Sequence, residues 1–311
     1  MARQPVFLVL RGGAIGDFIV TLPALAALRR RWPDAVIELV GYPHIANLAR
    51  LGGLVDRVRS LDEARMARFF SLRPEFPPEQ AAEIRSFDLV LSYLYDPHGV
   101  LRENMDRLGA KQFLYGSPIV EAGHAVEHMM KPLDTLAIYP EGDECPELVL
   151  TRRQVGEAGR RLPAPGDRVL AIHPGSGGVA KNWPVERFLD LAARVKEERG
   201  LTPLFICGEA DHALAPTLRE SGVAVLPTCP LTELAPILAA CAGYVGNDSG
   251  IAHLAACVGT PTVALFGPSD AVRWAPRGRR VTLLQADPPT AEGLAALPVE
   301  SVLSAASALV L

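Results

Sequence analysis

The sequence predicts an α/β protein of two doubly wound, Rossmann-like domains that face a central cleft. Short apolar runs alternate with segments of helical spacing through both halves of the chain, which is typical of parallel sheets covered by helices on both faces. The length of 311 residues leaves room for two such domains of about 150 residues each. Three glycine-containing turns also follow predicted strands, where ligands bind in open α/β sheets.

The first half of the chain contains five predicted strands and one long predicted helix. The helix covers residues 17–32, because Leu22, Leu25 and Leu28 recur at helical spacing, and it ends before Pro33. The strands are expected at residues 6–10, 36–40, 54–58, 88–91 and 112–115.

The pattern loosens between residues 135 and 168, which contain four prolines and a short predicted helix at 151–161. We place the domain boundary there, with an N-terminal domain at 1–150 and a C-terminal domain at 151–298. The apolar helix at 299–311 is expected to pack back on the first domain. Further strands are predicted at 169–172, 204–207, 223–226, 244–246 and 262–266, and further helices at 185–198, 213–221, 231–240 and 249–258.

Composition excludes several classes of protein. The net charge is −4, from 31 Lys and Arg against 35 Asp and Glu, which argues against a dedicated nucleic-acid binder. The five cysteines form no C-x-x-C pair and no zinc spacing, and they fit a reducing compartment. The sequence shows no signal-peptide pattern and no apolar run of about 20 residues. We expect a cytoplasmic protein whose only membrane contact would be peripheral, at the inner face of the cytoplasmic membrane.

The first glycine turn follows the strand at 6–10. Gly12, Gly13 and Gly16 allow a sharp turn before Asp17, which opens the next helix. The G-x-G-x-x-G dinucleotide spacing is absent, and a carboxylate at this place would repel a pyrophosphate. Asp17 therefore has two interpretations: a helix N-cap, or a general base at the cleft.

The second glycine turn runs from His173 to Gly178. Its backbone amides, around Ser176 and Gly177, resemble a phosphate nest, and Lys181 adds a cation just after it. It is not a P-loop, because no G-K-[ST] follows the glycines. Lys181 could equally be a solvated lysine, and we interpret His173 as structural.

The third glycine turn joins a strand to an apolar helix at residues 245–256. Backbone amides at such a helix start, where the helix dipole is positive, form a natural seat for a phosphate. Gly250 lets the backbone approach a ligand, and Asp248 or Ser249 can cap the helix. His253 shares the helix face of Ser249 and is by default a satisfied core histidine. The sequence has no metal-ligand cluster, so we expect no cofactor and no required metal.

Four segments resemble glycosyltransferase family 9, which contains the ADP-heptose:lipopolysaccharide heptosyltransferases. They are residues 11–17 with 21–25, 173–176 with 181–184, 247–253, and 259–268. The resemblance implies a glycosyltransferase-B fold, with the acceptor on the N-terminal domain and the nucleotide sugar on the C-terminal one. It also implies an inverting transfer without an obligatory metal.

The resemblance implies roles for individual residues. Asp17 matches the general base of the family, on an acceptor-side loop with Gly12, Gly13 and Gly16. Arg11 matches a basic position near an acceptor or donor phosphate. The positions that match donor-phosphate or donor-binding residues are Ser176, Gly177, Lys181, Asp248, Ser249, Gly250 and His253.

The expected function is transfer of heptose, or a related sugar, from ADP-heptose to a lipopolysaccharide core, lipid-linked or glycan acceptor. Two departures leave the particular sugar and acceptor open: no cysteine-containing stretch follows Pro268, and residues 65–78 match no known pattern. A nucleotide-sugar epimerase of similar fold is one alternative, although it would need acid and base groups around the donor sugar. A non-catalytic nucleotide-sugar-binding protein is the other.

Overall fold

The computed structural model describes residues 3–140, 142, 144–163, 166, 168–208, 211 and 213–310. The chain divides into two compact units, Met1–Glu144 and Cys145–Leu311. The division falls a few residues before the boundary predicted at residue 150. Each unit is a parallel sheet with its own helices, as the alternation of apolar runs and helical segments predicts.

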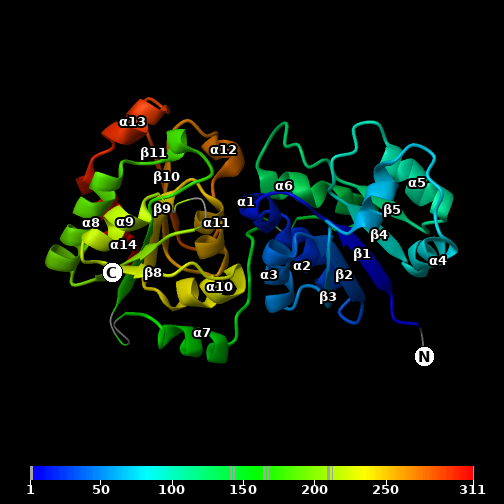
Figure 1. The fold of residues 1–311 in the computed structure, drawn as a ribbon, viewed down its shortest axis with the longest axis horizontal. Coiled ribbons are helices and arrows are strands. Elements are labelled where there is room, and N and C mark those ends of the chain that lie inside the picture. The colour runs from blue at the N-terminus through cyan, green and yellow to red at the C-terminus, as the bar shows by residue number, and fades with distance from the viewer. Residues whose placement is uncertain are drawn as a thin grey trace. The chain divides into compact units, whose positions relative to one another are not determined.

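The first unit is built on a five-stranded parallel sheet with the order β3-β2-β1-β4-β5 (Figure 1). Its strands are β1 (Val6–Leu10), β2 (Val36–Gly41), β3 (Arg57–Ser60), β4 (Leu89–Ser92) and β5 (Phe113–Tyr115). Its helices are α1 (Ile15–Ile19), α2 (Leu22–Arg31), α3 (Pro43–Leu51), η1 (Ala64–Phe70), α4 (Pro78–Ser86), α5 (Val100–Leu108), α6 (Ala125–Met130) and η2 (Lys131–Leu136). Strand order reverses beside β1, so the loop after β1 lies at the switch point where open sheets bind ligands.

The single helix predicted over 17–32 is two helices in the structure. Helix α1 ends at Ile19 and α2 begins at Leu22, with Pro23 in its first turn. Proline has no backbone N–H, so it suits the first turn of a new helix and not the interior of a continuous one. The apolar residues keep helical spacing across the break between α1 and α2, which is why the spacing alone predicted one continuous helix.

The second unit is built on a six-stranded parallel sheet with the order β11-β10-β9-β6-β7-β8. Its strands are β6 (Val169–His173), β7 (Thr202–Ile206), β8 (Ala224–Leu226), β9 (Gly243–Asn247), β10 (Thr262–Phe266) and β11 (Val281–Gln285). Its helices are α7 (Arg152–Gly159), η3 (Val179–Lys181), α8 (Val185–Arg199), α9 (Ala215–Glu220), α10 (Leu231–Ala240), α11 (Gly250–Cys257), α12 (Ala271–Trp274), α13 (Ala291–Ala296) and α14 (Val299–Val310). The reversal of order falls between β6 and β9, so the second and third glycine turns are neighbours.

Strand β11 is absent from the sequence-based expectations, and its position explains why. It pairs with β10 alone at the edge of the sheet, and its residues are exposed or half-buried. An edge strand needs no continuous apolar run, which is the signal that identifies the buried strands.

Helix α14 packs within the second unit, in contrast to the expectation that it would pack on the first domain. Val302, Leu303 and Ala306 are fully buried in the core of the second unit, with partners on α8, β9 and β10. The close packing is clearest at Gly243, where an added Cβ would lie 2.6 Å from the side chain of Val310. The apolar face of α14 is therefore used by its own unit.

The cysteines are free thiols, and three of them are buried as the sequence indicates: Cys207, Cys241 and Cys257. Burial raises the pKa of the Cys241 thiol to about 12. Across the described ranges, no helix is both long enough and apolar enough to cross a membrane.

Candidate functional site

The loop between β1 and α1 forms the part of the site in the first unit. Gly13 has φ +93°, which favours glycine, and an added Cβ would lie 2.9 Å from the Cβ of Asp17. Gly12 is packed as well, since an added Cβ would lie 3.3 Å from Leu61 and 3.5 Å from Leu94. The glycines of the motif therefore let the chain turn tightly against Asp17 and the neighbouring loops.

Asp17 is the third residue of α1, and the N-cap position belongs to Ala14. The N-cap interpretation is therefore wrong in position, although Asp17 still serves the helix start: Ala14 N–H donates to its Oδ2 at 3.0 Å. Its other oxygen, Oδ1, has no hydrogen-bond partner among the residues the structure describes. The hydrogen bond from Ala14 holds the carboxylate in one orientation. Because Asp17 is only half-buried, Oδ1 can still accept a hydrogen bond from a substrate.

Arg11 lies beside Asp17 in the first unit and is only 3% exposed. Its guanidinium donates to the backbone carbonyl of Asp17, and the Thr21 hydroxyl donates to the same carbonyl at 3.0 Å. Burial lowers the pKa of Arg11, while the charge of Asp17 and the buried Tyr93 act in the opposite direction. In this structure Arg11 therefore fixes the turn of Asp17; contact with a phosphate stays a prediction.

Replacing Gly13 with alanine should displace Asp17. We expect a loss of about 1–2 kcal/mol of stability from the positive φ, and a fall in turnover because the new Cβ meets the Asp17 side chain. Gly53→Ala is the matched control, since Gly53 has φ +70° and nothing within 4 Å of an added Cβ. Thermal unfolding and turnover are measured for both variants. Equal turnover in the two would contradict the positioning role of Gly13.

Asn247 joins the second and third glycine turns in the second unit. It is fully buried at the end of β9. Its Nδ2 donates to the carbonyl of Pro174 at 2.7 Å, and its Oδ1 accepts from the backbone N–H of Trp183 at 3.0 Å. One amide side chain thus fixes both sides of the segment that contains Lys181. Asn247 begins one of the segments that resemble the family, but the sequence alone indicates no role for it.

Lys181 and Asp248, predicted separately as donor-binding residues, form an ion pair. Lys181 Nζ lies 2.7 Å from Asp248 Oδ2. The lysine side chain is 42% exposed, whereas that of Asp248 is 9% exposed. Because a buried carboxylate holds the exposed cation, Asp248 orients Lys181; binding of an anion by the remaining ammonium donors stays a prediction.

Ser249 is the N-cap of α11: its Oγ accepts from the backbone N–H of Ala252 at 3.3 Å. The same Oγ lies 3.4 Å from Nδ1 of His173, whose Nε2 lies 2.9 Å from Oδ2 of Asp211. All three polar side chains are buried. This chain of contacts supports the structural interpretation of His173. The sequence alone does not indicate the contact between Asp211 and His173, because the two residues are 38 positions apart and meet only in the folded chain.

The loop after β6 is open at its tip. Added Cβ atoms at Gly177 and Gly178 would meet nothing within 4 Å, whereas one at Gly175 would lie 1.7 Å from Asp211 Oδ1. Ser176 Oγ donates to the Gly178 carbonyl at 2.8 Å and so closes a tight local turn. The glycines therefore serve two purposes: close packing at the base of the loop and access at its tip.

The structure brings most of the predicted donor residues together. Ser176, Gly177 and Lys181 follow β6, while Asp248, Ser249 and Gly250 follow β9, the adjacent strand. His253 lies further along α11 and is buried, 5% exposed. Arg11 and Asp17 belong to the first unit. Within the described part of the chain, no group of three or more His, Cys, Asp or Glu side chains could hold a metal ion.

Residues 104–295 match the family described as glycosyltransferase family 9 (heptosyltransferase), which is more than half of the chain. The chain belongs to glycosyltransferase family 9. It is therefore a glycosyltransferase, and the two Rossmann-like units confirm the predicted glycosyltransferase-B fold class.

Individual relatives agree over most of their length. Lipopolysaccharide heptosyltransferase 1 of Pseudomonas aeruginosa is 27% identical over 91% of this chain and 84% of its own. A solved glycosyl transferase of family 9 from Veillonella parvula has a TM-score of 0.79 at 21% identity, covering 100% of this chain and 98% of its own. The solved E. coli ADP-heptose lipopolysaccharide heptosyltransferase II also has a TM-score of 0.79, at 16% identity, covering 99% of this chain and 98% of its own.

Proposed function

We propose that this glycosyltransferase transfers heptose from ADP-heptose to a lipopolysaccharide-type acceptor, with inversion at the anomeric carbon and without a required metal. The observation that carries the proposal is the likeness of 91% of the chain to the lipopolysaccharide heptosyltransferase of P. aeruginosa. The solved E. coli neighbour described as an ADP-heptose enzyme supports the choice of donor. Because such an acceptor is lipid-linked, the proposal includes peripheral contact with the inner face of the cytoplasmic membrane.

The acceptor side of the reaction belongs to the first unit. An alcohol is a weak nucleophile at neutral pH, so a base within hydrogen-bond reach of its proton accelerates the attack. In the proposed step, Asp17 accepts the proton as the acceptor oxygen forms its bond to the anomeric carbon. Arg11 and Thr21 hold the Asp17 backbone, and the hydrogen bond from Ala14 orients the carboxylate.

The donor side belongs to the second unit. As the new glycosidic bond forms, the bond between the anomeric carbon and the diphosphate breaks, and ADP leaves with the electron pair. The growing negative charge would be met by Lys181, by the backbone amides around Gly177, and by the start of α11 at Gly250. Preorganised donors of this kind supply much of the barrier reduction in group transfer. No proton needs to be delivered to the diphosphate.

The proposal is tested with the purified chain, ADP-heptose and a deacylated inner-core oligosaccharide, followed by mass spectrometry. We expect ADP release and a product larger by one heptose unit, both unchanged by EDTA. ADP should bind more tightly than UDP or GDP in calorimetry. Addition of the lipid-linked acceptor in anionic vesicles should support transfer as well.

Two outcomes would overturn the proposal. Isomerisation of the donor sugar without any acceptor would identify an epimerase. Tight ADP-heptose binding with no turnover on any inner-core acceptor would identify a binding protein. Neither alternative has support in the comparisons, since the P. aeruginosa relative and the E. coli structure are both named as heptosyltransferases.

A further inference from the structure

A pocket of about 390 Å³ opens in the first unit, where the chain leaves β3 and β4. Its inner wall contains Leu61 and Leu94, and its rim contains the aromatic rings of Phe70 and Tyr95. We call it the Tyr95 pocket. Its volume falls in the lower part of the range of about 300–1,000 Å³ that is usual for small-molecule sites.

The Tyr95 pocket adjoins the loop that contains Asp17. An added Cβ at Gly12 would lie 3.3 Å from Leu61 and 3.5 Å from Leu94, so both wall residues pack on this loop. Gly13, the next residue, is the one whose added Cβ would meet Asp17. The inner wall of the pocket and the candidate base are therefore supported by the same short turn, and a molecule in the pocket lies on the acceptor side of the chemistry.

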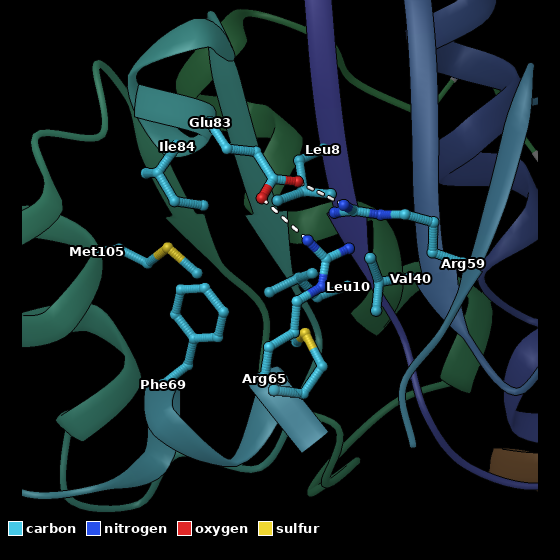
Figure 2. A pocket seen from close by; sticks show the side chains of 10 residues that line it. Leu8, Leu10, Val40, Arg59, Arg65, Phe69, Glu83, Ile84 and Met105 are labelled. Carbon is cyan, nitrogen blue, oxygen red and sulfur yellow. Dashed lines mark hydrogen bonds and ion pairs between the residues drawn. The ribbon is translucent and has the colours of Figure 1, made fainter. Parts of the chain in front are cut away.

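The outer wall of the pocket is held in place by ion pairs. The segment η1 supplies this wall, and Arg65 on η1 pairs with Glu83 of α4 at 3.1 Å. Glu83 also pairs with Arg59 of β3, and Figure 2 shows its carboxylate between the two guanidinium groups. The cavity beneath η1 measures only about 10 Å³, roughly one water molecule. The wall is thus packed against the sheet before any ligand binds.

The charges of the pocket are acidic. Asp62 and Glu63 are the charged residues of its lining, which includes no lysine or arginine. Glu63 is paired with Arg65, whose Nε lies 2.6 Å from the carboxylate and which also pairs with Glu83. The carboxylate of Asp62 has no ionic or hydrogen-bond partner among the described residues. Its oxygens can accept hydrogen bonds from hydroxyl groups, and its charge repels an anion.

The aromatic side chains of the rim are exposed to an unusual degree. Tyr95 is 60% exposed and Phe70 is 40% exposed. Flat apolar rings beside a hydrogen-bond acceptor suit a ligand with one apolar face and hydroxyl groups around its edge. A pyranose ring has this character.

We propose that the Tyr95 pocket binds an uncharged sugar unit of the acceptor and disfavours a sugar that bears a phosphate or carboxylate. Tyr95 and Phe70 contact the ring face, and Asp62 accepts hydrogen bonds from ring hydroxyls. The assignment of this sugar to the acceptor rests on the proposed function. The preference for an uncharged saccharide rests on the pocket itself.

Mannose and mannose 6-phosphate are the matched probes, titrated by ligand-observed NMR into the full chain with ADP at saturation to occupy the donor loops. At low salt we expect mannose to bind about fivefold more tightly than mannose 6-phosphate, as for one repulsive charge contact in water. Tyr95→Ala should weaken mannose binding by about tenfold. Asp62→Asn should bring the two probes close to equal affinity.

Exposed residues outside the pocket provide matched controls. Tyr139 is 62% exposed, so Tyr139→Ala removes a comparable ring and should leave both affinities unchanged. Asp34 is exposed before the amino end of β2, so Asp34→Asn removes a carboxylate from the opposite edge of the sheet. Asp34→Asn should leave the preference for mannose over mannose 6-phosphate unchanged.

Equal or tighter binding of mannose 6-phosphate by the unmodified chain would overturn the proposal. An unchanged affinity of Tyr95→Ala for mannose would overturn it as well. Failure of the proposed function looks different. In that case mannose binds with the expected preference, but the chain does not bind ADP or does not transfer heptose from ADP-heptose. The two results can therefore be told apart in one set of samples.

Discussion

Replacing Asp17 with asparagine should lower turnover by about 10²–10⁴-fold, the usual contribution of a positioned general base. Asparagine keeps the size of the side chain and an oxygen that accepts from the Ala14 N–H, so the start of α1 should keep its structure. It cannot accept a proton from an alcohol. The affinity for ADP should be unchanged, because the loops predicted to bind the donor belong to the second unit. Steady-state kinetics and calorimetry measure the two quantities.

The same pair of measurements separates the two interpretations of Asp17. If it serves only the helix start, Asp17→Asn should turn over at a near-normal rate, and Asp17→Ala should lower the melting temperature with little change in kcat. If it is the base, both variants should lose turnover to a similar extent. Asp34→Asn serves as the control for loss of one carboxylate in the same unit.

Replacing Lys181 with alanine should weaken ADP binding by about 10–100-fold, as expected for the loss of one charge-assisted contact to a diphosphate. The reason is twofold. The variant loses the cation, and it leaves the carboxylate of Asp248, previously 2.7 Å from Lys181 Nζ, unpaired beside the bound anion. Calorimetric titration with ADP measures the effect. An unchanged affinity would remove Lys181 from the donor site.

A double-mutant cycle tests whether Asp248 acts through Lys181. Asp248→Asn should weaken ADP binding because it releases Lys181. The variant with both Lys181→Ala and Asp248→Asn should lose less ADP-binding free energy than the sum of the two single losses, because no unpaired carboxylate remains beside the anion. Lys111→Ala is the matched control: Lys111 also makes a 2.7 Å ion pair, with Asp88, and its side chain is 44% exposed. Additive losses would show that Asp248 contacts the ligand independently.

The sequence predicted the buried part of the fold well. Strands such as β1 and β10 have the predicted bounds, because a strand buried on both faces must be a continuous apolar run. The features it missed lack that signal. Strand β11 is an edge strand, and the break between α1 and α2 occurs inside an unbroken apolar pattern. The residues of α14 could not predict which domain it packs against, since an apolar helix face fits the hydrophobic core of either unit.

The candidate site divides in the same way. The sequence singled out Asp17, Lys181 and Asp248 because glycine turns at strand ends expose polar residues. It did not predict that Lys181 and Asp248, 67 residues apart, form one ion pair. It also assigned no role to Asn247, whose function depends on contacts with two other loops.

By itself, the sequence determined the class of fold, the family and the glycine turns that form the candidate site. These features depend on local spacing, such as apolar periodicity and the conformational freedom of glycine, which a single stretch of chain already contains. Tertiary structure decided which charges pair, that Asp17 lies inside α1 and not at its cap, and that an aromatic pocket with an unpaired Asp62 adjoins it. Such features depend on strand order and packing, which bring residues distant in the chain within a few ångströms of each other.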